Sequence, residues 1–207
     1  MSQKKNILSV VFIIFIVAIF RIVNNHLHIY NLIPIAALGI FSGSILKEKK
    51  YAYIIPLLAM LFSDIGIGLT SNMSGFYGIS QIVNYTALIG VTFLGTRLNR
   101  HTPLRIAGFS LTASLIFFIV SNFGTYLSGY YGFGLESFIN CYIMALPFYK
   151  HELATEFFLN AFIGDLLFSY FAFGMYHALN TKSSIYQLTT KTGCNSFRFF
   201  VFFVKKR

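Results

Sequence analysis

Six apolar runs divide the chain, and short polar segments separate them. Runs of this length, almost free of charge, predict membrane-spanning helices. The sequence therefore predicts an all-α integral membrane protein with six transmembrane helices in a single domain, residues 1–180. The predicted spans are residues 7–20, 32–46, 51–69, 79–95, 106–127 and 153–178.

The segment between the fifth and sixth runs differs from a simple loop. A Gly/Tyr-rich turn follows Asn122, and a short apolar stretch, residues 138–148, ends around Pro147. We expect this stretch to form a short interfacial or re-entrant helix, because it is too short to cross a bilayer. The chain then enters the last run carrying Glu152 and Glu156. We interpret the segment as the lid and one wall of a pocket open to the outside.

The last part of the chain, residues 181–207, is a basic and aromatic tail. It is polar at first and ends FRFFVFFVKKR. The aromatic run 197–204 is too short to span a membrane. A cytoplasmic interfacial anchor and a disordered tail both fit this composition.

The distribution of basic residues predicts the orientation. With the N-terminus in the cytoplasm, 14 of the 16 Lys and Arg residues fall on the inner side, and Arg21 and Lys150 are the two exceptions. Such asymmetry predicts six spans with both termini in the cytoplasm of a multi-pass cell (inner) membrane protein. The inner residues are Lys4, Lys5, Lys47, Lys49, Lys50, Arg97, Arg100, Arg105, Lys182, Lys191, Arg198, Lys205, Lys206 and Arg207.

Composition agrees with this class and argues against others. The chain is 56% hydrophobic and 11% charged, against about 25% charged in soluble domains. Its net charge of +10 lies in short loop clusters, so we expect no nucleic-acid partner. Because phosphate-loop, GxSxG and HExxH motifs are missing from the sequence, we expect no enzyme activity and no cofactor. His26, His28 and His151 are too scattered to predict a metal site.

Polar residues recur inside the apolar runs at similar depth. At about 1.5 Å per helical residue, Arg21, Asp64, Asn84 and Asp165 lie roughly 20 Å from the cytoplasmic end of their helices. Because charge inside a bilayer needs a partner or a cavity, we expect the layer to form the floor of a substrate site. Its members are Arg21, Asp64, Asn84, Asn122, Asn160 and Asp165, with Tyr126 above them.

Two interpretations of this layer remain open. In the first, Arg21 pairs with Asp64 or Asp165 and the layer binds a solute. In the second, Arg21 extends to the outer headgroups and the asparagines join helices. The outer aromatic residues, Tyr126 among them, suit an interfacial belt, or a planar ligand if some turn inward.

Small residues in the second run predict close helix packing. Gly39 and Gly43 form a GxxxG pattern, and Ala36 lies one turn before Gly39. Such a face packs against another helix of the same bundle or against a partner protein, and we favour the internal contact.

Several stretches carry a family resemblance. They are FRIVNN with NLIPIAALGIFSGSIL, IPLLAMLFSDIGIG, FFIVSNFGTYL and CYIMALPFYKHELATEFFLNAFIGDLLFS. Over residues 21–174 the chain resembles a family of small uncharacterised membrane proteins of the DUF type. That family is similar to the substrate-binding (S) components of energy-coupling factor (ECF) vitamin transporters.

The resemblance implies a six-helix bundle with a small-molecule site near the outer face. It also implies a transmembrane coupling partner and two ATPases. S components commonly meet that partner through small residues such as AxxxA on the first helix. Here the first run reads ILSVVFIIFIVAIF, and the small residues lie in the second run instead.

Together, the polar layer and this resemblance imply a solute-binding and uptake component for a vitamin-like nutrient. A non-transporting structural or assembly subunit of a membrane complex is the main alternative. An intramembrane enzyme acting on lipid-linked substrates is a third.

Overall fold

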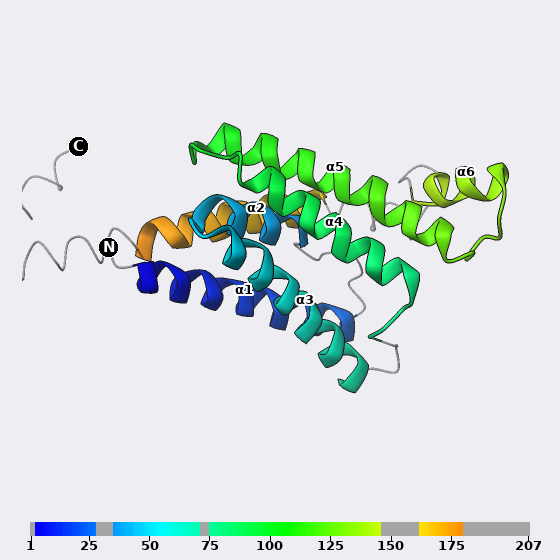
Figure 1. Ribbon diagram of the computed structural model, residues 1–207, viewed down its shortest axis with the longest axis horizontal. Helices are drawn as coiled ribbons and strands as arrows, with labels where there is room; N and C mark the ends of the chain where they lie inside the picture. Colours follow the sequence, from blue (N-terminus) through cyan, green and yellow to red (C-terminus); the bar gives the residue numbers. More distant parts are fainter. Residues whose placement is uncertain (1–2, 28–34, 71–74, 146–161, 180–207) are drawn as a thin grey trace, which may run out of the picture. The chain divides into compact units, whose positions relative to one another are not determined.

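The computed structural model describes residues 3–27, 35–70, 75–145 and 162–179, and within these ranges all regular secondary structure is helical (Figure 1). The predicted all-α class is confirmed. The helices are α1 (Gln3–His26), α2 (Ile35–Ile45), α3 (Lys49–Thr70), α4 (Ile79–Gly95), α5 (Pro103–Leu127), α6 (Leu135–Ile143) and a last helix, Phe162–Leu179.

Three of these helices are long and apolar enough to cross a membrane. They are α3, α5 and the last helix, Phe162–Leu179. Val10–His26 of α1, together with α2 and α4, forms shorter apolar helices. Many large apolar side chains point outward, among them Leu104, which is 85% exposed, and Leu69, which is 82% exposed. A surface this apolar is typical of helices that contact lipid.

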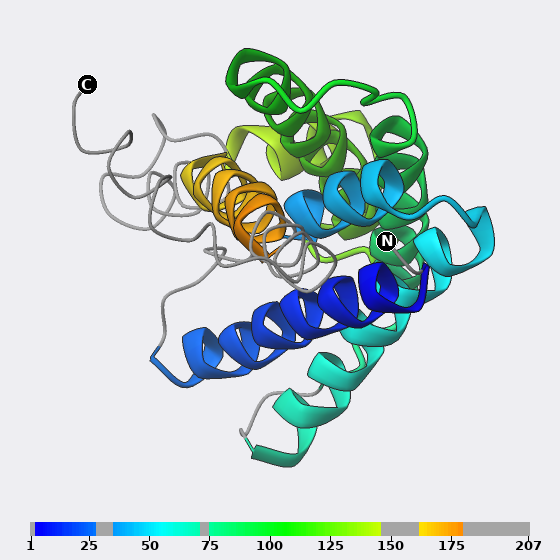
Figure 2. The same ribbon diagram turned by 90° about the vertical axis from the view of Figure 1, so that its left-hand side faces the viewer.

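The short helix α2 lies at the centre of the packing within residues 1–173. It contacts α1, α3, α4 and α5 (Figure 2). Nine of its 11 residues are buried. A helix that is apolar on all sides belongs in the interior of a bundle.

Glycines bring α2 and α4 into backbone contact. A Cβ added at Gly43 would lie 2.3 Å from the Thr92 carbonyl oxygen, and one at Gly39 would lie 2.8 Å from Val91 Cγ1. From the other side, a Cβ at Gly95 would lie 2.7 Å from the Ile40 Cα. The GxxxG face of α2 is thus occupied by α4 within the same chain.

A proline in α3 is compensated by a side chain of α2. Pro56 has no N–H, so the carbonyl of Ala52, one turn earlier, loses its usual helical donor. The Ser42 hydroxyl donates to that carbonyl at 3.0 Å. Buried backbone acceptors need such partners, most of all in lipid.

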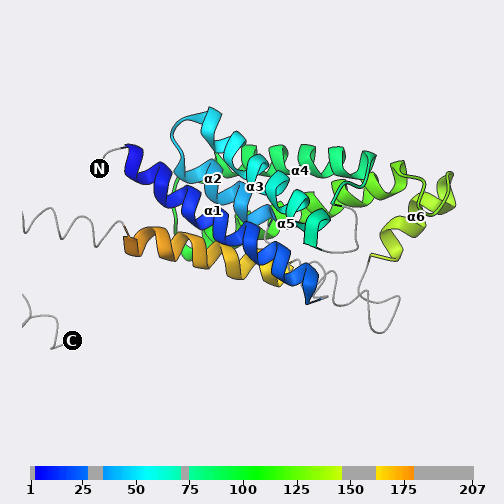
Figure 3. The same ribbon diagram turned by 90° about the horizontal axis from the view of Figure 1, so that it is seen from below.

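Two helices differ from their predicted ranges. α1 continues to His26, so Arg21 lies inside the helix, whereas the predicted first run ends at residue 20. In these polar last turns Arg21 binds side chains and a carbonyl of α3, and Asn24 is buried. The short helix α6 begins at Leu135, earlier than the predicted stretch 138–148, after a turn with positive φ at Gly129, Gly132 and Gly134. It packs at the C-terminal end of α5 (Figure 3).

The chain divides into two compact units, Met1–Phe173 and Gly174–Arg207. In the first unit, the Phe173 ring packs edge-on against Phe41 of α2 at a centroid distance of 5.3 Å. The described part of the second unit is the end of the last helix, where the Tyr176 and His177 rings are 6.1 Å apart. The boundary predicted after residue 180 lies outside the described residues.

Candidate functional site

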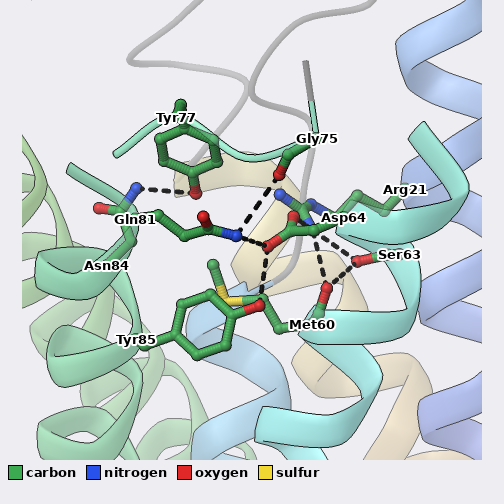
Figure 4. A network of polar contacts seen from close by, with 9 residues as sticks. All are labelled: Arg21, Met60, Ser63, Asp64, Gly75, Tyr77, Gln81, Asn84 and Tyr85. Atoms are coloured by element: carbon green, nitrogen blue, oxygen red, sulfur yellow. Dashed lines mark hydrogen bonds and ion pairs between the residues drawn. The ribbon is translucent and has the colours of Figure 1, made fainter. Parts of the chain in front are cut away.

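A buried ion pair joins α1 to α3. Arg21 Nη1 binds Asp64 Oδ1, and the same nitrogen donates to Ser63 Oγ and to the Met60 carbonyl (Figure 4). Arg21 is 8% exposed and Asp64 is 1% exposed. Two charges withdrawn from solvent in this way depend on each other, because either one alone would be strongly unfavourable.

The second carboxylate oxygen of Asp64 binds α4. Gln81 Nε2 donates to Asp64 Oδ2 at 2.9 Å, and the Tyr85 hydroxyl donates to the same atom at 2.8 Å. Gln81 and Tyr85 are four residues apart, so they share one face of α4. We call Arg21, Ser63, Asp64, Gln81 and Tyr85 the Arg–Asp cluster, which joins three helices.

The segment before α4 closes over this cluster. The Gly75 carbonyl accepts from Gln81 Nε2 at 3.4 Å, and a Cβ at Gly75 would lie 1.9 Å from the Asp64 carbonyl oxygen. Only glycine allows such an approach. At the edge, Asn84 Nδ2 donates to the Tyr77 hydroxyl at 3.2 Å. Desolvation raises the pKa of Tyr77, so its phenol is neutral at physiological pH.

A small cavity lies beside the cluster. Its volume is about 10 Å³, and Arg21, Ser63 and Met60 line it together with apolar side chains. Within the described part of the chain, Arg21 Nε has no hydrogen-bond partner. The cavity has room for about one water molecule, so a larger solute would have to displace side chains of the cluster.

The second buried carboxylate forms a separate site. Asp165 Oδ1 accepts from the Ala37 N–H at 3.0 Å, and its Oδ2 accepts from Ser114 Oγ at 2.7 Å. Ala37 lies in the first turn of α2, where backbone N–H groups have no helical acceptor. The carboxylate therefore caps α2 from another helix and interacts favourably with the positive end of its dipole. One helical turn further along, the Ser169 hydroxyl donates to Ser110 Oγ at 3.1 Å.

The structure separates the predicted layer into several environments. Of the two acids considered for Arg21, Asp64 is its partner, and Asp165 contacts α2 and α5 instead. Asn84 reaches the edge of the Arg–Asp cluster through Tyr77. Asn122 donates to the Phe118 carbonyl of its own helix at 2.8 Å. Asn160 lies outside the described residues, as do Glu152 and Glu156.

Tyr126 belongs to an aromatic group between α5 and α6. Its ring meets Phe138 edge-on at 5.3 Å, and Phe138 lies 5.1 Å from Tyr142. The Tyr142 hydroxyl donates to the Ile119 carbonyl at 3.0 Å, so these rings attach α6 to α5. The structure thus gives Tyr126 a role in helix packing, whereas the sequence placed it above the polar layer.

A comparison with protein families shows which family the chain belongs to. A model of a family of unknown function, DUF6580, matches residues 1–188. The chain belongs to this family. No curated protein and no solved structure matches it. The predicted membership of a DUF-type family is confirmed, whereas the similarity of DUF6580 to ECF S components stays a prediction.

Three members of the cluster were missed in the sequence of this DUF6580 protein. Ser63, Gln81 and Tyr85 are uncharged and lie within apolar runs, so they did not stand out as charged residues do. The i, i+4 spacing of Gln81 and Tyr85 is the signal that predicts a shared polar face. Among the described residues, no group of three His, Cys, Asp or Glu side chains forms a metal site.

Replacing Ser114 with alanine tests the second site. The change removes the Ser114 donor to the buried Asp165 carboxylate, and hydrogen bonds to charged groups contribute about 1.5–3 kcal/mol. We expect a loss of that size in detergent, measured by SDS denaturation followed by circular dichroism. Ser121→Ala is the control, because that hydroxyl donates within its own helix to the Phe118 carbonyl. Equal effects of the two changes would contradict the role of Asp165.

Proposed function

We propose that this DUF6580 protein is a solute-binding component for uptake of a small, vitamin-like nutrient, and that the Arg–Asp cluster is its binding site. The observation that carries the proposal is the buried Arg21–Asp64 pair, which joins α1 to α3 and is surrounded by polar side chains of α3 and α4. Ionisable groups inside membrane proteins mark substrate and ion pathways, because retaining them is costly.

The chemistry of the cluster indicates the kind of solute. The Arg21 guanidinium suits a carboxylate, and Asp64 suits an ammonium or hydroxyl donor. Gln81 and Tyr85 add hydrogen-bonding groups beside Asp64. We therefore propose a polar solute with a carboxylate group. On binding, this solute replaces contacts that the side chains of the cluster otherwise make with one another. Because the neighbouring cavity is only about 10 Å³, binding requires the cluster to open.

The proposed membrane arrangement has six spans, an outward-facing site and both termini in the cytoplasm. Three long apolar helices support membrane insertion. The eleven residues of α2 extend about 16 Å, roughly half of a bilayer core of about 30 Å. The six-span topology therefore requires residues flanking α2 to complete its crossing.

A coupling partner and ATPases belong to the same proposal. Their support is the resemblance to ECF S components. Since α4 occupies Gly39 and Gly43, a coupling protein would have to use a different face of the bundle.

A structural or assembly subunit is the second candidate, and one observation favours it. All four carboxylate oxygens of Asp64 and Asp165 already accept from donors of the protein itself. In that account the cluster joins helices and binds no solute.

Native mass spectrometry distinguishes the two candidates. The protein is purified in mild detergent, and small molecules released on activation are identified. We expect a stoichiometric solute on the wild type and on Asp165→Asn, and its loss on Asp64→Asn. Circular dichroism checks that each protein is folded, because Asp64→Asn leaves the buried Arg21 without its anion. A folded wild type without any bound solute, or one whose solute is unaffected by Asp64→Asn, would contradict the proposed site.

A further inference from the structure

An open groove lies where α4 ends and α5 begins, away from both buried carboxylates. Its volume is about 360 Å³. The lining residues are Leu94, Leu104, Arg105, Gly108, Phe109 and Thr112. The groove thus combines apolar walls with one cationic side chain.

The chain segments that form the groove carry positive charge alone. Arg105 lines it, Arg97 follows Leu94 by three residues, and Arg100 lies in the same connection. The Arg97 guanidinium stacks over the Phe93 ring at 5.0 Å. The sequence from residue 65 to residue 135, which includes all of α4 and α5, contains no Asp or Glu. Charge complementarity therefore calls for an anionic occupant.

The apolar walls narrow the choice of occupant. Leu104 is 85% exposed, and it belongs to α5, one of the helices able to cross a membrane. The groove begins at the N-terminal end of α5 and extends over the first turns of that helix. A helix end with this composition lies where headgroups meet acyl chains.

We propose that this groove binds one anionic phospholipid, with its phosphate at Arg105 and an acyl chain along Leu94 and Phe109. Basic pockets between transmembrane helices on the cytoplasmic side bind such headgroups. A free anion would leave the apolar walls unused, and a second copy of the chain would bring the same positive charge. The inference requires a membrane-embedded bundle but does not depend on the solute of the Arg–Asp cluster.

A lipid titration followed by native mass spectrometry tests the proposal. Delipidated full-length protein is titrated with phosphatidylglycerol or with phosphatidylcholine of the same acyl chains. We expect one tighter site for phosphatidylglycerol. Arg105→Gln should weaken it about fivefold, because one basic residue near the surface contributes about 1 kcal/mol and 1.4 kcal/mol is tenfold. Arg100→Gln removes the same charge outside the groove lining and should weaken binding less.

Glycine substitutions test the acyl-chain half of the groove. A Cβ at Gly108 meets no atom within 4 Å, so Gly108→Leu fills the groove without a clash at that atom. We expect this change to remove the tighter phosphatidylglycerol site, because the new side chain occupies the space of the acyl chain. Gly90→Leu is the matched control on α4, where a Cβ also meets nothing within 4 Å.

Four binding results would overturn the proposal. They are equal binding of the two lipids, equal effects of the two arginine variants, full binding by Gly108→Leu, and displacement of the lipid by equimolar inorganic phosphate. A dimer of the wild type that Gly108→Leu dissociates would assign the groove to a second copy and would also overturn it.

Discussion

Replacing Arg21 with methionine is expected to destabilise the folded protein by about 3–5 kcal/mol, the range for breaking a buried ion pair from one side. The change leaves Asp64 buried at 1% exposure without its cation. Gln81 and Tyr85 still donate to Asp64, but neither carries a compensating charge. SDS denaturation in mixed micelles, followed by circular dichroism, measures the loss.

The double variant Arg21→Met/Asp64→Asn is the matched test. It removes both charges, and the carbonyl of the introduced asparagine still offers an acceptor to Gln81 and Tyr85. Replacing both members of a buried pair is often close to neutral, so we expect the double variant to recover most of the lost stability. A double variant as unstable as Arg21→Met would show that the unpaired charge of Asp64 does not cause the loss of stability.

Replacing Gly43 with alanine is expected to cost about 2–3 kcal/mol through overpacking between α2 and α4. The added Cβ would lie 2.3 Å from the Thr92 carbonyl oxygen and 3.0 Å from the Thr96 nitrogen, both backbone atoms. Backbone atoms of a packed helix cannot move aside as a side-chain tip can. The two helices must therefore separate, and the same denaturation assay measures the effect.

Gly90→Ala is the control for this prediction. It makes the same substitution in α4, at a position where a Cβ meets no atom within 4 Å. Alanine favours a helix over glycine by up to about 1 kcal/mol, so we expect no loss and a small gain. A loss at Gly90 as large as that at Gly43 would contradict the close contact of α2 with α4.

The apolar runs predicted the ranges of α3 and α4 closely. The run at residues 79–95 matches α4, and the run at 51–69 lies within Lys49–Thr70. The first run was predicted too short because Arg21 and Asn24 are polar. The contacts of Arg21 with α3 stabilise α1 beyond the point where local apolarity ends.

Helical depth in the sequence identified the charged members of the cluster but not their pairing. Periodicity and depth give the height of a residue along its helix, yet they do not say which helices are neighbours. Asp64 and Asp165 were therefore equivalent candidates for Arg21. The packing of α1 on α3 decides between them.

The most direct test of the central claim is native mass spectrometry of Arg21→Met/Asp64→Asn beside the wild type. This double variant is expected to remain folded, which separates loss of the site from loss of the structure. We predict that the wild type releases a stoichiometric polar solute and that the folded double variant releases none. Retention of the same solute by the double variant would contradict a binding site at Arg21 and Asp64.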